Sequence, residues 1–181
     1  AKRPASLPRL QAHAAVGQSR LMYLYETAGA KHGFHCGQML LSTADVQDRE
    51  RHLNIASCMN ALLAAGVLPV VNENDSVSVD EIKFGDNDTL AAMVALLARA
   101  DLTILLTAVD GLHDRDGDQL GKRVSVVDEV TDEIRAMAGD TEDRNTSIGG
   151  MISKLAAADT VTRAGEPLWI ADGRDFGVLQ A

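Results

Sequence analysis

An apolar run that leads directly into a polar cluster is the feature that most restricts how this chain folds. Residues 67–71 read VLPVV, a β-branched run with the length of a buried strand. Four short polar or acidic residues follow at once: Asn72, Glu73, Asn74 and Asp75. Ligands of open α/β sheets bind at the carboxyl ends of the strands. The sequence therefore predicts a ligand site at the end of this strand.

A second polar cluster, formed by Asp86, Asn87 and Asp88, stands at the start of an amphipathic helix. The spacing i, i+3, i+4, i+7 predicts that one face of this helix is buried: Leu90, Met93, Val94 and Leu97. Between the clusters, alternating residues predict a β-hairpin over 76–84 that brings the two clusters together over a substrate site. A single Asp before a helix is most simply a cap. Two converging polar clusters favour a binding site.

Strands and helices alternate along the chain. Apolar runs predict further strands at 38–41, 102–106, 124–127 and 167–171, with Trp169 in the core. Periodicity and caps predict helices at 6–30, 46–65, 86–98, 131–137 and from 151 onward, the last with a face of Met151, Leu155, Ala158 and Thr162. Residues 113–122 are expected to be a polar surface excursion and 139–147 a loop. Long crossovers suit parallel pairing. We therefore predict a single α/β domain over residues 1–181, a three-layer α/β/α sandwich with a mainly parallel sheet.

Composition limits the partners of the chain. Its 181 residues are 46% hydrophobic and 24% charged, as in ordinary globular domains. No apolar run approaches the roughly 18 residues that span a membrane, so we expect no membrane partner and a cytoplasmic location. The formal charge of −9 argues against nucleic acid. Cys36 and Cys58 and the five histidines lack metal-ligand spacing, so no metal site built from side chains is expected.

Two glycines open the last predicted helix. Gly149 and Gly150 precede Met151, and Lys154 lies one helical turn further on, on the same side as Gly150. Glycines at a helix start let backbone N–H groups approach an anion, and the helix dipole favours negative charge there. The pattern indicates a phosphate site, and the alternative is a solvated lysine.

These motifs together resemble the glutamate 5-kinases of the amino acid kinase family. The resemblance is carried by N-E-N-D at 72–75, E-I-K-F-G-D-N-D at 81–88, L-L-T-A-V-D-G-L at 105–112 and G-G-M-I-S-K-L at 149–155, and by A-A-V-G-Q-S-R-L-M at 14–22. It implies ATP-dependent phosphorylation of the side-chain carboxylate of L-glutamate to L-glutamyl 5-phosphate, the first step of proline biosynthesis. It also implies a homo-oligomer, a dimer or a tetramer, with feedback by proline.

The resemblance assigns roles to individual residues. Asp75 and Asn87 would hold glutamate, with Asp75 on its ammonium group, and Asn72 and Asp86 would frame the catalytic site. Asp88 would orient the catalytic Lys154, which would neutralise charge on the transferring phosphoryl group. The nucleotide would contact Thr107, Ala108, Gly149, Gly150, Met151 and Lys154. Mg²⁺ would be held mainly through the nucleotide phosphates.

Departures from the family pattern support a second hypothesis, a non-catalytic homologue or fragment that binds glutamate or proline. The family begins with a strand and a K-x-G-S/T turn whose lysine is catalytic, and no such motif precedes Ala1. The family's T-D is Thr107–Ala108 here, and its G-T-G-G-M is S-I-G-G-M at 147–151. We also expect the family's usual C-terminal PUA domain, which resembles RNA-binding domains and which some members lack, to be absent. We therefore expect a domain that is incomplete at its N-terminus and has little kinase activity alone.

Overall fold

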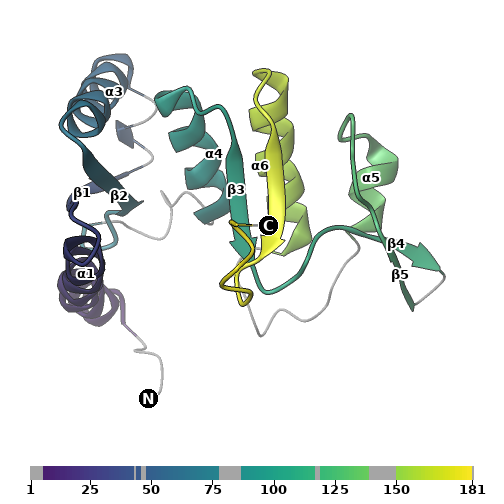
Figure 1. Ribbon diagram of the computed structural model, residues 1–181, viewed down its shortest axis with the longest axis horizontal. Helices are drawn as coiled ribbons and strands as arrows, with labels where there is room; N and C mark the ends of the chain where they lie inside the picture. The colour runs from purple at the N-terminus through teal and green to yellow at the C-terminus, as the bar shows by residue number, and fades with distance from the viewer. Residues whose placement is uncertain are drawn as a thin grey trace. The chain divides into compact units, whose positions relative to one another are not determined.

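The structure is a computed structural model that describes residues 6–42, 44–45, 48–77, 87–116, 119–138 and 150–180 (Figure 1). The chain forms two compact units, Ala1–Phe84 and Gly85–Ala181. Both units combine helices with parallel strand pairs, so the fold is α/β, as the sequence predicts. Organisation of 1–181 as one domain stays a prediction. No helix within the described ranges is both long enough and apolar enough to cross a membrane.

The first unit pairs two parallel strands and two helices. Its elements in chain order are α1 (Leu7–Ala30), β1 (His35–Leu41), α3 (Arg49–Ala64) and β2 (Val67–Glu73). The strands are in register from His35 opposite Val67 to Leu41 opposite Glu73. The strand predicted at 38–41 therefore begins three residues earlier, because β2 supplies a pairing partner that short-range periodicity does not reveal.

The two helices of the first unit cover opposite faces of the strand pair (Figure 1). A side-chain carbon placed on Gly37 of β1 would lie 3.0 Å from Leu62 of α3. The next strand residues that point the other way, Gln38 and Leu40, line a cavity together with residues of α1. Since successive side chains of a strand alternate between its faces, this unit has α/β/α layers.

Local sequence signals set the helix ends in this unit. Pro8 stands in the first turn of α1, where its missing N–H costs nothing, and the Asp48 side chain caps α3 by accepting a hydrogen bond from the Arg51 N–H. After each helix the chain reverses through a glycine with positive φ, +79° at Gly33 and +70° at Gly66. The predicted bounds of the first helix and the predicted C-terminal end of the second are confirmed, whereas α3 begins at Arg49 with Asp48 as its cap, three residues after the predicted start.

The second unit is built on another parallel pair. Its elements are α4 (Asn87–Ala98), β3 (Thr103–Thr107), β4 (His113–Asp116), β5 (Gln119–Arg123), α5 (Asp132–Met137), α6 (Met151–Arg163) and β6 (Leu168–Asp172). β3 and β6 are in register from Thr103 opposite Leu168 to Thr107 opposite Asp172. The core joins the two long helices to β3, and three of its five buried residues are alanines: Ala92, Ala95, Leu105, Ala157 and Val161. Alanines at this contact let the helices lie close together.

Several sequence-based expectations for this unit are wrong. Residues 124–127 are not a strand, and the polar stretch 113–122 instead holds the antiparallel hairpin of β4 and β5, whose backbone pairing needs no apolar side chains. Trp169 is 61% exposed rather than part of the core. Of the hairpin expected over 76–84, the structure describes only residues 76 and 77, which form a turn. The loop expected at 139–147 lies outside the described residues.

The buried faces of the two long helices differ in part from the periodicity argument. In α4, Leu90 and Leu97 are buried as predicted, but the alanines at 92 and 95 are buried as well, and Met93 and Val94 are only half-buried. In α6 the buried residues are Lys154, Leu155, Ala157 and Val161, and Thr162 is exposed. The expected faces followed residue size and hydrophobicity. The real faces are set by close helix packing, which favours alanine, and by a lysine that has a buried partner.

Candidate functional site

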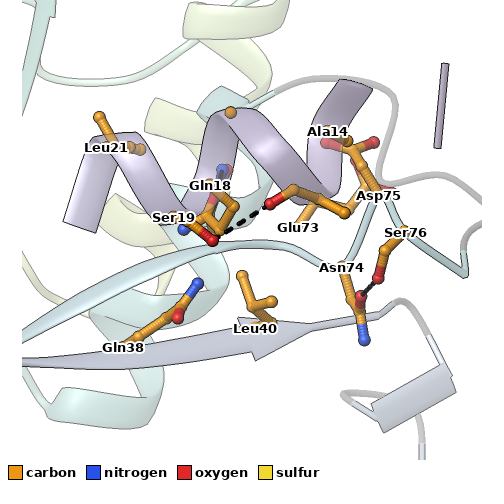
Figure 2. A pocket seen from close by; sticks show the side chains of 13 residues that line it. Ala14, Gln18, Ser19, Leu21, Gln38, Leu40, Glu73, Asn74, Asp75 and Ser76 are labelled. Atoms are coloured by element: carbon orange, nitrogen blue, oxygen red, sulfur yellow. Dashed lines mark hydrogen bonds between the residues drawn. The ribbon is translucent and has the colours of Figure 1, made fainter. Parts of the chain in front are cut away.

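The first unit contains a cavity of about 580 Å³ between α1, β1 and the end of β2 (Figure 2). Its volume falls in the range of small-molecule sites. Small residues of α1, among them Ala14 and Gly17, leave room on one wall, and Gln38 and Leu40 of β1 lie on another. The cavity is therefore open because α1 carries a stripe of small side chains where it crosses the strand pair.

The polar cluster at the end of β2 lines this cavity. Asn72 and Asp75 both contribute to its wall, as the strand-end argument expects. The Asn72 side-chain Nδ2 donates a hydrogen bond of 3.0 Å to Oε1 of Gln18 on α1. The turn that follows is held locally, since the backbone N–H of Asn74 donates to the Leu41 carbonyl and the Ser76 hydroxyl donates to the Asn74 side chain. Among the described residues that line the cavity there are two carboxylates and no lysine or arginine.

The second unit contains a largely buried ion pair between α4 and α6. Lys154 Nζ lies 2.9 Å from Asp88 Oδ2, and the two side chains are 9% and 16% exposed. The same carboxylate oxygen is 2.7 Å from the Ser153 hydroxyl. A charge-assisted, desolvated contact of this kind fixes both side chains. The structure thus brings together Asp88 and Lys154, which are 66 residues apart in the sequence.

The amino end of α6 supplies the surroundings of this ion pair. Gly150 is the N-cap, with φ of −80° and no side chain to cap the helix, and Met151 is the first helical residue. By helix geometry the first-turn N–H groups have no acceptor within the helix. The Ser153 hydroxyl lies 2.8 Å from the Gly150 carbonyl as well as near Asp88. Having one proton, it donates to one of these oxygens at a time, and the carboxylate forms the stronger bond.

The turn after β3 lies beside the end of β6. The Gly173 N–H donates a 2.8 Å hydrogen bond to the Thr107 carbonyl. Ala108 is exposed and contributes no charge to this turn. The paired Arg174 guanidinium, which contacts both oxygens of Asp172, lowers the pKa of that carboxyl to about 2. The end of the strand pair is therefore a charge-paired region.

A histidine joins the same turn to the β4–β5 hairpin. His113 Nε2 lies 2.8 Å from Asp110 Oδ1, and its Nδ1 lies 3.1 Å from the Gly121 carbonyl. Both neighbours are acceptors, so the ring satisfies both only when each nitrogen carries a proton. The hydrogen bond that His113 donates to the Asp110 carboxylate raises the pKa of His113 and lowers the pKa of Asp110.

Three other predicted site residues lie outside the cavity wall and the ion pair, or outside the described residues. Asn87 is the exposed first residue of α4, and Asp86 and Gly149 lie outside the described residues. Within the described ranges no three His, Cys, Asp or Glu side chains form a metal-binding group. Gln18 and Ser153 were not among the sequence candidates, although Gln18 stands beside Gly17 on the small-residue stripe and Ser153 directly precedes Lys154.

Comparison with known proteins gives a consistent family assignment. The profile described as "Amino acid kinase family" matches residues 2–172. The protein named glutamate 5-kinase from Syntrophus aciditrophicus (strain SB) is 45% identical over 176 residues, which cover 96% of this chain and 46% of that protein. The protein of the same name from Yersinia pestis (strain Pestoides F) is 47% identical over 178 residues, which cover 97% of this chain and 48% of that protein. The chain spans about half the length of the curated relatives it matches.

Proposed function

The chain belongs to the amino acid kinase family, and from this premise we propose that it is part of an ATP-dependent glutamate 5-kinase. The reaction would transfer the γ-phosphoryl group of ATP to the side-chain carboxylate of L-glutamate and so begin proline biosynthesis. The 45% and 47% identical relatives that carry this name support the substrate assignment. Our proposal includes a cytoplasmic homo-oligomer, a dimer or a tetramer, with feedback by proline.

The observation that carries the proposal is the ion pair of Lys154 with Asp88. Phosphoryl transfer depends on positioning and on cations that meet the developing negative charge. Lys154, a largely buried lysine at a glycine-capped helix start, would supply such a cation, and its ion pair with Asp88 would hold the ammonium group in one position. Asp88 would serve as a positioning residue, since a carboxylate does not itself stabilise a transferring phosphoryl group.

The cavity of the first unit supports the amino acid half of the proposal. Its volume of about 580 Å³ suits a small molecule, and its wall carries Asp75 together with neutral amides. We propose that Asp75 accepts the ammonium group of glutamate, with Asn72 beside it. We also propose Asp86 and Asn87 as members of the site, from their place in the G-D-N-D motif.

The residues at the α6 end fit nucleotide phosphates. The Gly150 cap, the first-turn N–H groups from Met151 onward and Lys154 form a donor set without a competing side-chain cap. Thr107, Ala108 and Gly149 would complete the nucleotide contacts. Mg²⁺ would be held mainly through the nucleotide phosphates and would neutralise part of their charge.

An ADP-release assay with L-glutamate, ATP and Mg²⁺ tests the proposal. We expect glutamate-dependent turnover by the full-length natural protein and little or none by the 181-residue chain alone. The exposed Ala108, where the resemblance implies a carboxylate, favours one other function, a non-catalytic module that binds glutamate or proline. Glutamate binding by the full-length protein without ADP release would establish that function and overturn the kinase proposal.

A further inference from the structure

Gln18 makes a polar contact that the proposed roles leave unexplained. Its Oε1 accepts the 3.0 Å hydrogen bond from Asn72 Nδ2 across the contact of α1 with β2. Both residues line the cavity of the first unit. Side chain–side chain bonds are a small minority of protein hydrogen bonds. A bond between two neutral amides that are 54 residues apart in the sequence, at the wall of a cavity, therefore calls for a reason.

The remaining atom of the Gln18 amide shows that this contact is not simply a stabilising one. Gln18 Nε2 is buried and has no hydrogen-bond partner among the described residues. Burying an amide N–H without a partner is unfavourable, and an apolar side chain of the same length would avoid that penalty. Selection for stability alone would therefore not favour a glutamine here. The side chain is better explained by what it does to Asn72.

A primary amide presents a donor at one end and an acceptor at the other. Because Asn72 Nδ2 is bonded to Gln18, the orientation of the Asn72 amide is fixed, and its Oδ1 is the end that remains to accept a hydrogen bond. The neighbouring Asp75 carboxylate also offers only acceptors when ionised. Two acceptors on one wall match a ligand group that has several donors, such as an ammonium.

We propose that Gln18 is a positioning residue that holds the Asn72 carboxamide with its carbonyl oxygen toward the ammonium group of the bound amino acid. This inference rests on the proposed function, because it takes L-glutamate as the ligand. Gln18 then contributes to the distinction between an amino acid and the corresponding dicarboxylate, without touching the reacting atoms.

The test is a double-mutant cycle in the full-length natural protein, which compares Gln18→Met, Asn72→Ala and the variant that carries both substitutions. Dissociation constants are measured by calorimetry for L-glutamate and, by competition, for glutarate, which lacks the ammonium group. Arg20→Met, an exposed change on the same helix, is the matched control. Thermal unfolding of each variant is recorded in parallel.

We expect Gln18→Met to weaken L-glutamate binding roughly two- to tenfold, the value of one neutral hydrogen bond. It should leave glutarate binding and the melting temperature unchanged or improved, and it should add nothing in the Asn72→Ala background. Additive effects, an equal loss for glutarate, or the same loss in Arg20→Met would overturn the inference while the kinase proposal stands. Absence of L-glutamate binding by the unsubstituted protein would overturn both.

Discussion

The charged groups that line the cavity of the first unit and those of the second unit differ in sign and in pairing. The cavity wall has two carboxylates, several neutral amides and no described lysine or arginine. In the second unit Lys154 is bonded to Asp88, Arg174 to Asp172 and His113 to Asp110. The cavity thus offers acceptors to a ligand, whereas the second unit holds cations in fixed positions.

This difference matches the two halves of a kinase reaction. An amino acid brings an ammonium group, which carboxylate and amide oxygens recognise. A nucleotide brings phosphates, which need fixed cations and N–H groups. Substitutions in the cavity wall should therefore change the affinity for the amino acid alone. Substitutions of the paired charges in the second unit should change kcat and the dependence of stability on pH.

Removal of the Lys154 ammonium should have the largest effect. Lys154→Met keeps most of the side-chain volume but removes the cation that we propose meets charge growing in the transition state. We expect kcat to fall on the order of 10²- to 10³-fold with little change in the glutamate KM. The measurement is steady-state kinetics on the full-length protein. Unchanged kcat would leave Lys154 with a structural role only.

The same substitution should also lower stability. Asp88 is 16% exposed and would lose its counter-ion, which in buried pairs costs about 3–5 kcal/mol. Urea unfolding measures this loss. Arg163→Gln is the matched control on α6, because Arg163 is 76% exposed and its i,i+4 bond to Asp159 should contribute little to stability. Lys154→Arg, which keeps the charge, should recover part of the stability.

Substitution in the cavity should produce a smaller and more selective effect. Asp75→Asn keeps the size of the side chain but removes its charge. We expect the affinity for L-glutamate to fall about tenfold to a hundredfold, the value of a charge-assisted hydrogen bond of roughly 1.5–3 kcal/mol. Binding of a non-hydrolysable ATP analogue should be nearly unchanged. Equal losses for the two ligands in calorimetry would show that Asp75 supports the fold instead.

Sequence reasoning identified the strand-end cluster at Asn72–Asp75 and the α/β alternation, because short apolar runs and caps are local signals. By contrast, the pairing of Asp88 with Lys154 was predicted only from the family resemblance, since no local pattern links residues on two different helices. Gln18 was missed because its importance depends on a contact between α1 and β2. The exposed Trp169 and the alanine-rich helix contact were missed because hydrophobicity does not report packing distance.

The His113 contact predicts a pH response in the second unit. A raised pKa means that the folded state binds the proton more tightly, so this group stabilises the fold fully below its ordinary value of about 6.5. The contribution is lost as the pH rises through the higher, folded-state pKa. We expect His113→Phe to reduce the decline in melting temperature as the pH rises above about 6.5. The exposed His32→Gln is the control, and an unaltered pH profile in His113→Phe would contradict the prediction.

The smallest expected effect concerns the end of β6. The pKa of Asp172 is lowered to about 2, first by the side-chain bonds from Arg174 and then by the Arg174 backbone N–H. A lowered carboxyl pKa gives stability that is present above the ordinary value of about 3.9 and is lost as the pH falls through the folded-state value. Arg174 is 70% exposed, so the effect on stability at neutral pH should be slight.

The direct measurement is an NMR titration of the Asp172 carboxyl carbon. Arg174→Gln should raise the pKa of Asp172 toward its ordinary range, because the guanidinium is lost while the backbone N–H of residue 174 remains as a weaker donor. Arg163→Gln should raise the pKa of Asp159 in the same direction but leave Asp172 unchanged, since Arg163 supplies the largest lowering effect on Asp159. If the pKa of Asp172 stays near 2 without Arg174, the fixed cation does not control charge at this strand end. The contrast with the acceptor-lined cavity would then rest on Lys154 and His113.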